Sequence, residues 1–229
     1  MRRTLFALLL LLAPPSFADT LLTIKSRVEG LNMPGQSPEG TTRVWLAGDK
    51  LRRDDGDTST ILRLDRNKLY ILDHAAKTYS ELPLPVDLQK LAGLPKDALP
   101  KTDVKVTSTN ETKKVKEWNA RKVKVAVSNA AGLKLDTTMW VSKDVPSFAA
   151  FNKMLASMAA LQPAGTELSR KLETIEGFPV LQETQVEMNG SRFTAREELV
   201  SVETKDAPAG AYEPPAGYKV QPFAGIVPR

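Results

Sequence analysis

The stretch TRVWLAGDKLRR, residues 42–53, shows the pattern that recurs along this chain. Two short runs of high β-propensity, 42–47 and 50–53, flank the pair Gly48-Asp49. Glycine readily adopts the positive φ that a tight hairpin turn requires. The stretch therefore predicts two antiparallel strands joined by a two-residue turn.

The same alternation of apolar and polar side chains continues along most of the chain. A period of two is typical of strands that bury one face. Turn-forming residues separate the runs at 54–57, around Asn110, at 129–132 and at Asn189-Gly190. Strands at intervals of about 8–12 residues predict one all-β sheet, sandwich or barrel. The further strands are predicted at 22–28, 60–65, 68–72, 77–82, 104–107, 122–127, 133–141, 183–187, 193–197 and 199–204.

One segment departs from this period and predicts an amphipathic helix of about four turns over residues 146–161. Pro146 suits a position in its first turn. A shorter helix is predicted over 86–94, between flanking prolines. The predicted fold class is therefore mainly β, with one longer and one short helix against an antiparallel sheet. The apolar side chains at helical spacing in the longer helix are Phe148, Phe151, Met154, Leu155 and Met158.

Residues 1–18 predict a cleaved secretory signal peptide. Two arginines precede an apolar run over 4–13, and small residues precede a predicted cut between Ala18 and Asp19. The run is too short for a membrane span, which takes about twenty residues, and no later segment predicts one. Without a Cys at the cut, no lipid anchor is expected there. We expect a single domain, residues 19–229, in the periplasm, with secretion as the alternative.

Composition argues against several kinds of chemistry. The chain has no Cys and a single His, His74, so neither a typical zinc site nor a Cys or Ser-His nucleophile is expected. No catalytic residue, metal or cofactor is predicted. Removing residues 1–18 takes away two arginines and no acid, so the net charge falls from +5 to +3. The cationic runs are short and interrupted by acids, which argues against a nucleic-acid partner.

Five stretches resemble a family of small exported bacterial proteins of unassigned function. They are WLAGDKLR at 45–52, KTYSE at 77–81, NETKKVKEWNARK at 110–122, MWVSKDV at 139–145 and YEPPAGY at 212–218. The resemblance implies a fold like that of the periplasmic lipoprotein carriers LolA and LolB. That fold is a strongly curved antiparallel sheet, a half-barrel, whose concave apolar face is covered by helices.

The sequence leaves two functions open. In the first, a non-enzymatic binding protein holds a lipid or other apolar molecule in a cavity under the Phe/Met helix. In the second, the same helix caps a solid core, and the protein is an interaction or sensor domain that docks an envelope protein. Trp45 and Trp140 fall out of phase with the aliphatic positions of their strands, which places them on the other sheet face or at a cavity rim. The sequence specifies neither the ligand nor the oligomeric state.

Overall fold

The structure is a computed structural model that describes residues 18–30, 38–86, 102–146, 148–152, 154, 167–172, 174–188 and 190–223. Its twelve strands form one sheet in the order β12-β6-β5-β4-β3-β2-β1-β11-β10-β9-β8-β7. Neighbouring strands are antiparallel except for β12, which pairs with β6 in parallel. The prediction of a mainly β chain with an antiparallel sheet is confirmed.

The strands are β1 (Thr20–Glu29), β2 (Glu39–Ala47), β3 (Lys50–Asp55), β4 (Thr58–Arg63), β5 (Lys68–Asp73), β6 (Thr78–Pro83), β7 (Thr102–Val115), β8 (Trp118–Asn129), β9 (Lys134–Ser142), β10 (Phe178–Met188), β11 (Ser191–Thr204) and β12 (Lys219–Val220). A 3-10 turn, η1 (Leu64–Arg66), joins β4 to β5, and the helix α3 (Glu167–Leu172) precedes β10. Residues 148–152 and 154 are also helical. Among the described helices, none combines the length and the apolar character that a membrane crossing needs.

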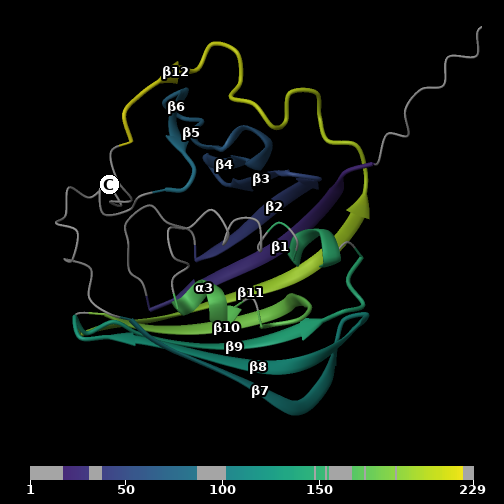
Figure 1. Ribbon diagram of the computed structural model, residues 1–229, viewed down its shortest axis with the longest axis vertical. Helices are drawn as coiled ribbons and strands as arrows, with labels where there is room; N and C mark the ends of the chain where they lie inside the picture. The colour runs from purple at the N-terminus through teal and green to yellow at the C-terminus, as the bar shows by residue number, and fades with distance from the viewer. Residues whose placement is uncertain are drawn as a thin grey trace, which may run out of the picture.

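The sheet is open and curved (Figure 1). Strands β3–β6 and strands β7–β10 lie at opposite ends, and α3 lies between these two parts, over what we call the inner face. The structure describes only part of the helical cover that the sequence predicts. The shorter helix predicted over 86–94 lies almost wholly outside the described residues, as does the second half of the longer one.

Two apolar clusters fill the inner face. The larger joins strands from both parts of the sheet and includes Leu22, Leu62 and Val180, each at most 3 % exposed. Burial of an aliphatic side chain of this kind contributes about 1.5–3 kcal/mol. The second cluster lies on β7–β9 and contains Val104, Val123, Val125, Val127, Met139 and Val141.

The hairpin of residues 42–53 forms as predicted. In β2 and β3, Leu46 pairs with Leu51 on the inner face, and Trp45 pairs with Arg52 on the opposite, outer face. Gly48, in the turn, has a φ of +56°, which a residue with a Cβ adopts only under strain. Because side chains alternate along a strand, this pair of strands has an apolar inner face and a different outer face that carries Trp45 and Arg52.

The turn predicted around Asn110 is wrong. Strand β7 continues past this residue to Val115 and turns into β8 at Lys116, where φ is +53°. The register with β8 shifts in this part of β7, and the Thr109 hydroxyl donates to the carbonyl of Lys122 at 3.1 Å. The polar stretch is an irregularity within a long strand, because its side chains supply hydrogen bonds that the ladder lacks there.

The outer face of β2–β6 is covered by residues 205–223, which we call the C-terminal strap (Figure 1). The strap ends in β12, and the backbone amides of Lys219 and Gln221 donate to carbonyls of the segment that leads into β6 and of β6 itself. Tyr212 of the strap packs against a third apolar cluster, Ile61, Tyr70 and Leu72, each at most 5 % exposed. No pattern in the sequence predicts the place of this segment on the sheet.

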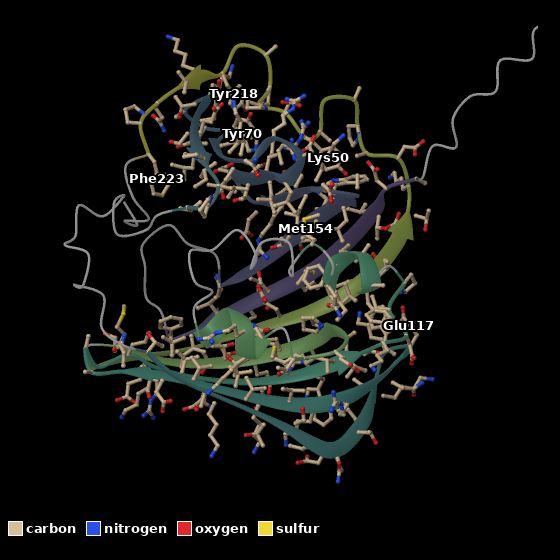
Figure 2. The ribbon with its side chains drawn as sticks, in the orientation of Figure 1. Lys50, Tyr70, Glu117, Met154, Tyr218 and Phe223 are labelled. Carbon is tan, nitrogen blue, oxygen red and sulfur yellow. The ribbon has the colours of Figure 1, made fainter. Side chains whose placement is uncertain are left out.

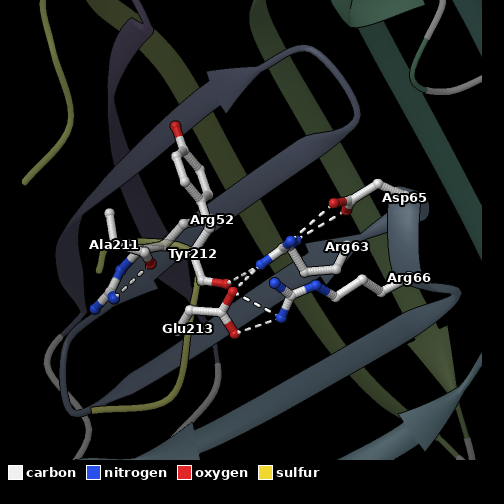
Figure 3. A network of polar contacts seen from close by, with 7 residues as sticks. All are labelled: Arg52, Arg63, Asp65, Arg66, Ala211, Tyr212 and Glu213. Carbon is white, nitrogen blue, oxygen red and sulfur yellow. Dashed lines mark hydrogen bonds and ion pairs between the residues drawn. The ribbon is translucent and has the colours of Figure 1, made fainter. Parts of the chain in front are cut away.

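Arg63 fixes the strap to β4 (Figure 3). Its side chain is 5 % exposed, and two of its nitrogens donate to the carboxylate of Asp65, both at 2.8 Å. A third nitrogen donates to the carbonyl of Tyr212 at 3.2 Å and to the carboxylate of Glu213. Arg66, which is half exposed, contacts the same Glu213 at 2.9 Å. The hydrogen bonds from Arg63 lower the pKa of Asp65 below its ordinary value.

We expect Arg63→Met to destabilise the protein by about 2 kcal/mol, because it removes charge-assisted hydrogen bonds at a buried site. Arg66→Met is the matched control, since Arg66 shares the Glu213 partner but is exposed, and it should cost less than about 1 kcal/mol. Urea unfolding measures both values. Amide exchange at Lys219 and Gln221 reports whether the strap opens first. Equal costs for the two variants would contradict the role given to Arg63.

The Asp65 contact predicts a dependence of stability on acid. Because the folded state lowers the pKa of Asp65, its contribution is complete above the ordinary aspartate pKa of about 3.9. The contribution is lost as the pH falls below that value. Asp65 is partly exposed, so the loss should be at most about 1 kcal/mol. Asp65→Asn should flatten this part of the urea-midpoint profile, whereas Asp57→Asn, in an exposed turn, should leave the profile as in the wild type.

Candidate functional site

A cleft of about 180 Å³ opens on the inner face between β1–β3, the start of β10, β11 and the helical segment at 148–152. Its walls are mostly apolar. Leu22, Ile24, Val44, Leu51, Phe151, Phe178, Pro179 and Leu199 line it, together with the polar side chains of Arg53, Gln182 and Glu197.

Strand alternation explains why these side chains meet. Leu22 pairs with Val44 between β1 and β2, and Ile24 pairs with Leu199 between β1 and β11, so all four point to the inner face. Phe178 begins β10 directly after Gly177, whose φ is +117°. A Cβ at Gly177 would lie 3.0 Å from the backbone of Ser142. Glycine at this position therefore lets β10 approach β9 closely, which sets the start of β10 beside the cleft.

Phe151 closes one side of the cleft. Its ring lies edge-on to that of Phe178, with the ring centroids 4.7 Å apart and the planes at 62°. Edge-to-face pairs of this kind contribute about 0.5–1.5 kcal/mol beyond their buried area. The pair ties the helical segment to the sheet at the cleft wall.

An ion pair between Arg53 and Glu197 lies beside the apolar part of the cleft. Arg53 lies 3.6 Å from Glu197 and 3.4 Å from Asp55, and both Arg53 and Glu197 are a little over one-third exposed. Gln182 pairs with Glu197 across β10 and β11. The arrangement can hold an apolar group against the sheet and present a polar end to the ion pair.

The predicted helix residues divide between two places. Phe148 and Met154 pack into the larger inner cluster, and Met154, 3 % exposed, lies between the two parts of the sheet (Figure 2). Phe151 packs against the same cluster and also lines the cleft. Leu155 and Met158 lie outside the described residues.

Neither tryptophan lines the inner cleft. Trp45 pairs with Arg52 on the outer face, is 8 % exposed, and lines a hollow beneath the strap. Trp140 alternates with Met139 and Val141 of the second cluster, pairs with the buried Leu181 of β10 and packs against the larger cluster. The Lys113 ammonium lies 4.1 Å from its ring centroid.

His74 takes part in a hydrogen-bonded chain on the outer face. The Ser59 hydroxyl donates to Asp54, and the same oxygen lies 2.6 Å from His74 Nε2. His74 Nδ1 lies 2.8 Å from the hydroxyl of Tyr218, in the strap. Because the one Ser59 proton goes to a carboxylate, Nε2 must carry a proton that it donates to Ser59. In neutral His74 the Tyr218 hydroxyl then donates to Nδ1.

This chain differs from a hydrolase triad in its connections. In a triad the acid holds the imidazole and the serine is open to substrate. Here the acid holds Ser59, the imidazole is held by Tyr218, and Ser59 is 1 % exposed. The contacts attach the strap to β4. Across the described ranges, no group of three or more His, Asp or Glu side chains is arranged to hold a metal ion.

Sequence reasoning missed most of the cleft lining. The alternation identified Leu22, Ile24, Val44 and Leu51 as strand residues with a buried face, but it did not show that β1 lies beside β11. Phe178, just before the predicted strand 183–187, was missed altogether. The one available signal was the Gly-Phe-Pro step at 177–179, which is typical of a constrained strand start.

The chain was compared with curated proteins, with solved structures and with family models. No curated protein matches the chain. Two structures of PNGF-II align with 90 % and 84 % of this chain at 14 % and 15 % identity, with TM-scores of 0.43 and 0.39. The chain spans only 31 % and 29 % of those proteins. A structure described as an outer membrane lipoprotein-sorting protein domain from Vibrio parahaemolyticus aligns at 8 % identity with a TM-score of 0.32, covering 86 % of this chain and 90 % of that one.

At these TM-scores the structural likenesses assign neither a fold nor a function. The family comparison is more direct. The model described as Domain of unknown function (DUF4412) matches residues 39–218, which run from the first residue of β2 to the last residue before β12. The chain therefore belongs to the DUF4412 family.

Proposed function

We propose that this protein is a non-enzymatic binding protein that holds the apolar part of a lipid, or another small apolar molecule, in the inner-face cleft. The observation that supports this function is the lining of the cleft, with eight apolar side chains and three polar ones. Ligand sites are typically concave and mostly apolar, with a few polar groups that orient the ligand.

The volume limits what the cleft can take. About 180 Å³ is close to the roughly 150 Å³ of an engineered apolar cavity that binds benzene. It is below the 300–1,000 Å³ that is usual for whole drug-sized ligands. We therefore propose that the cleft takes one ring or one end of an acyl chain, with the rest of the molecule outside.

Phe151 links ligand binding to the helical segment. It supplies a cleft wall from outside the sheet, and its main described contact there is Phe178. A ligand in the cleft would contact both rings. The position of Phe151 supports the predicted role of the Phe/Met helix as a cover. Of the five predicted residues, Phe151 is the one within the described part of the chain that lines the cleft.

The outer-face histidine supports a function without catalysis. Both imidazole nitrogens of His74 lie within hydrogen-bond distance of protein groups, and Ser59 is closed to solvent. A nucleophile has to reach its substrate, and a general base has to accept the proton of that nucleophile. For the location, the signal-like residues 1–18 support export to the periplasm, with secretion as the alternative.

The small volume of the cleft favours a second candidate, an interaction or sensor domain with a solid core. Strand β7 is the outermost strand at one end of the described sheet and pairs with β8 alone. Open strand edges are common docking sites for a partner strand. In this alternative, an envelope protein would bind β7, and the cleft would be an imperfectly packed part of the core.

Filling the cleft tests the binding function. We expect Ile24→Trp to occupy part of the space and to weaken binding of dodecanoic acid and of the dye phenylnaphthylamine at least about tenfold. Val28→Trp is the matched control, because it enlarges a half-buried residue on the same strand outside the cleft. Dye fluorescence measures affinity. Dodecanoic acid at about 100 times its Kd should add about 2.7 kcal/mol to the wild-type stability, which a shift in Tm detects.

Two results would contradict the binding function. One is a wild-type protein whose Tm and dye fluorescence do not change with either probe. The other is equal binding by both tryptophan variants, which would place the probes elsewhere. Mass spectrometry of an organic extract of the purified protein gives an independent measurement. An extract without lipid, combined with an unchanged Tm, would favour the solid-core alternative.

A further inference from the structure

The β7–β8 hairpin carries most of the net charge of the chain. Residues 102–129 contain seven Lys and Arg and three Asp and Glu, an excess of +4, and the whole chain has +5. Along the sequence these cations look like short runs interrupted by acids. In the structure, the runs Lys113-Lys114 and Arg121-Lys122 lie on adjacent strands.

Most of these cations have no carboxylate of the described chain at ion-pair distance. Within the described residues, the hairpin's ion pairs are those of Lys116 with Glu198, at 3.7 Å, and of Lys122 with Glu111, at 2.9 Å. The described chain places no carboxylate within 4.0 Å of the other five, Lys105, Lys113, Lys114, Lys124 and Arg121. On β9–β11, by contrast, every cation has a partner: Lys134 and Arg192 pair with Glu187, and Arg196 pairs with Glu183 and Glu198.

The hairpin lies at the opposite end of the sheet from the strap (Figure 1). Lys105 and Lys124 alternate with buried valines of the second inner cluster, so both point to the outer face, and both are exposed. Lys113, also exposed, lies over the ring of Trp140. Lys114, also exposed, extends the charge along the edge strand. These lysines concentrate positive charge at one end of the sheet, where Asp103 is the exposed acid on the same side of β7 as Lys105.

We propose that this hairpin docks the protein on an anionic phospholipid surface. Six of its seven cations are lysines. A lysine ammonium is a hydrated point charge, whereas arginine has the rigid fork that recognises a single phosphate or carboxylate in two places. Several separate lysines therefore suit a surface with charge spread over many headgroups. The inference goes beyond the binding function and does not depend on the cleft taking a ligand.

The aromatic side chains argue against single-stranded nucleic acid as the partner. Such sites combine basic residues with open rings on which bases stack. On the hairpin itself, Trp118 is 3 % exposed, and the neighbouring Trp140 is partly covered by Lys113. The described surface thus offers positive charge without a stacking platform.

The test is sedimentation with vesicles, using the exported protein as cells produce it, after its N-terminus has been determined by mass spectrometry. Vesicles of equal parts phosphatidylglycerol and phosphatidylcholine should bind it, and vesicles of phosphatidylcholine alone should not. Raising the ionic strength from about 0.1 M to about 1 M should release it, because the Debye length falls from about 10 Å to about 3 Å.

The triple variant Lys105→Gln, Lys114→Gln and Lys124→Gln should partition onto the anionic vesicles at least about tenfold more weakly. A lysine near an anionic surface contributes a factor of about five. The matched control is Lys77→Gln, Lys205→Gln and Lys219→Gln, which changes the net charge equally but lies at the strap end. It should bind as the wild type does. Unchanged thermal unfolding of both variants establishes that they are folded.

Three results would overturn the proposal. Equal weakening by the two triple variants would show that only net charge matters. Equal binding to neutral and anionic vesicles would exclude an electrostatic surface. Tighter binding to a single-stranded oligonucleotide than to anionic vesicles, lost in the hairpin variant alone, would assign the surface to nucleic acid.

Discussion

One constraint shapes the structure: strands β2 and β4 bury side chains on both faces, such as Leu46 and Trp45, so the outer face also needs cover from outside the sheet. On the inner face the cover is apolar. On the outer face, Arg52 and Arg63 stand at strand positions directly opposite the core, and backbone carbonyls of the strap satisfy them. Arg52 donates to Ala211 at 3.0 Å, and Arg63 donates to Tyr212 (Figure 3). Without the strap these guanidinium groups would have fewer acceptors and the aromatic cluster beneath it would be exposed.

The strap is also fastened at the start of the described chain. Asp19 accepts hydrogen bonds from the Tyr212 hydroxyl at 3.0 Å and from the Ala207 amide at 3.2 Å, and its carbonyl accepts from the Lys205 amide at 2.9 Å. Burial, together with the Asp19 hydrogen bond, raises the pKa of Tyr212, so its hydroxyl stays a donor. Asp19 is the residue predicted to follow the signal cut, so cleavage at that point would leave this anchor in the mature protein.

Sequence patterns predicted the local structure well and the long-range arrangement poorly. The hairpins were predictable because Gly48 and Gly190 mark turns between alternating runs. Alternation also predicted the antiparallel strands, whereas the curved sheet was implied only by the family resemblance. The position of the strap was not predictable, because the stretch YEPPAGY has no periodic pattern from which a sheet face could be inferred. The cleft depends on β1 lying between β2 and β11, an order that local patterns do not encode. The turn predicted around Asn110 was wrong because a polar irregularity within a strand and a polar turn have the same composition.

The alternation that requires the strap also connects it to the candidate site. Strands β2 and β3 send Val44 and Leu51 into the inner cleft. Their outward neighbours, Trp45 and Arg52, lie against the strap. Both surfaces thus share the same backbone, and a side chain cannot shift on one face without moving the strand that carries the other. Any coupling between the cleft and the strap is reciprocal. A ligand that stabilises one arrangement of these strands binds more tightly when the strap stabilises the same arrangement. Three of the four prolines of the strap, Pro208, Pro214 and Pro215, line the hollow beneath it and restrict the backbone there, so the outer face can hold the cleft wall in place.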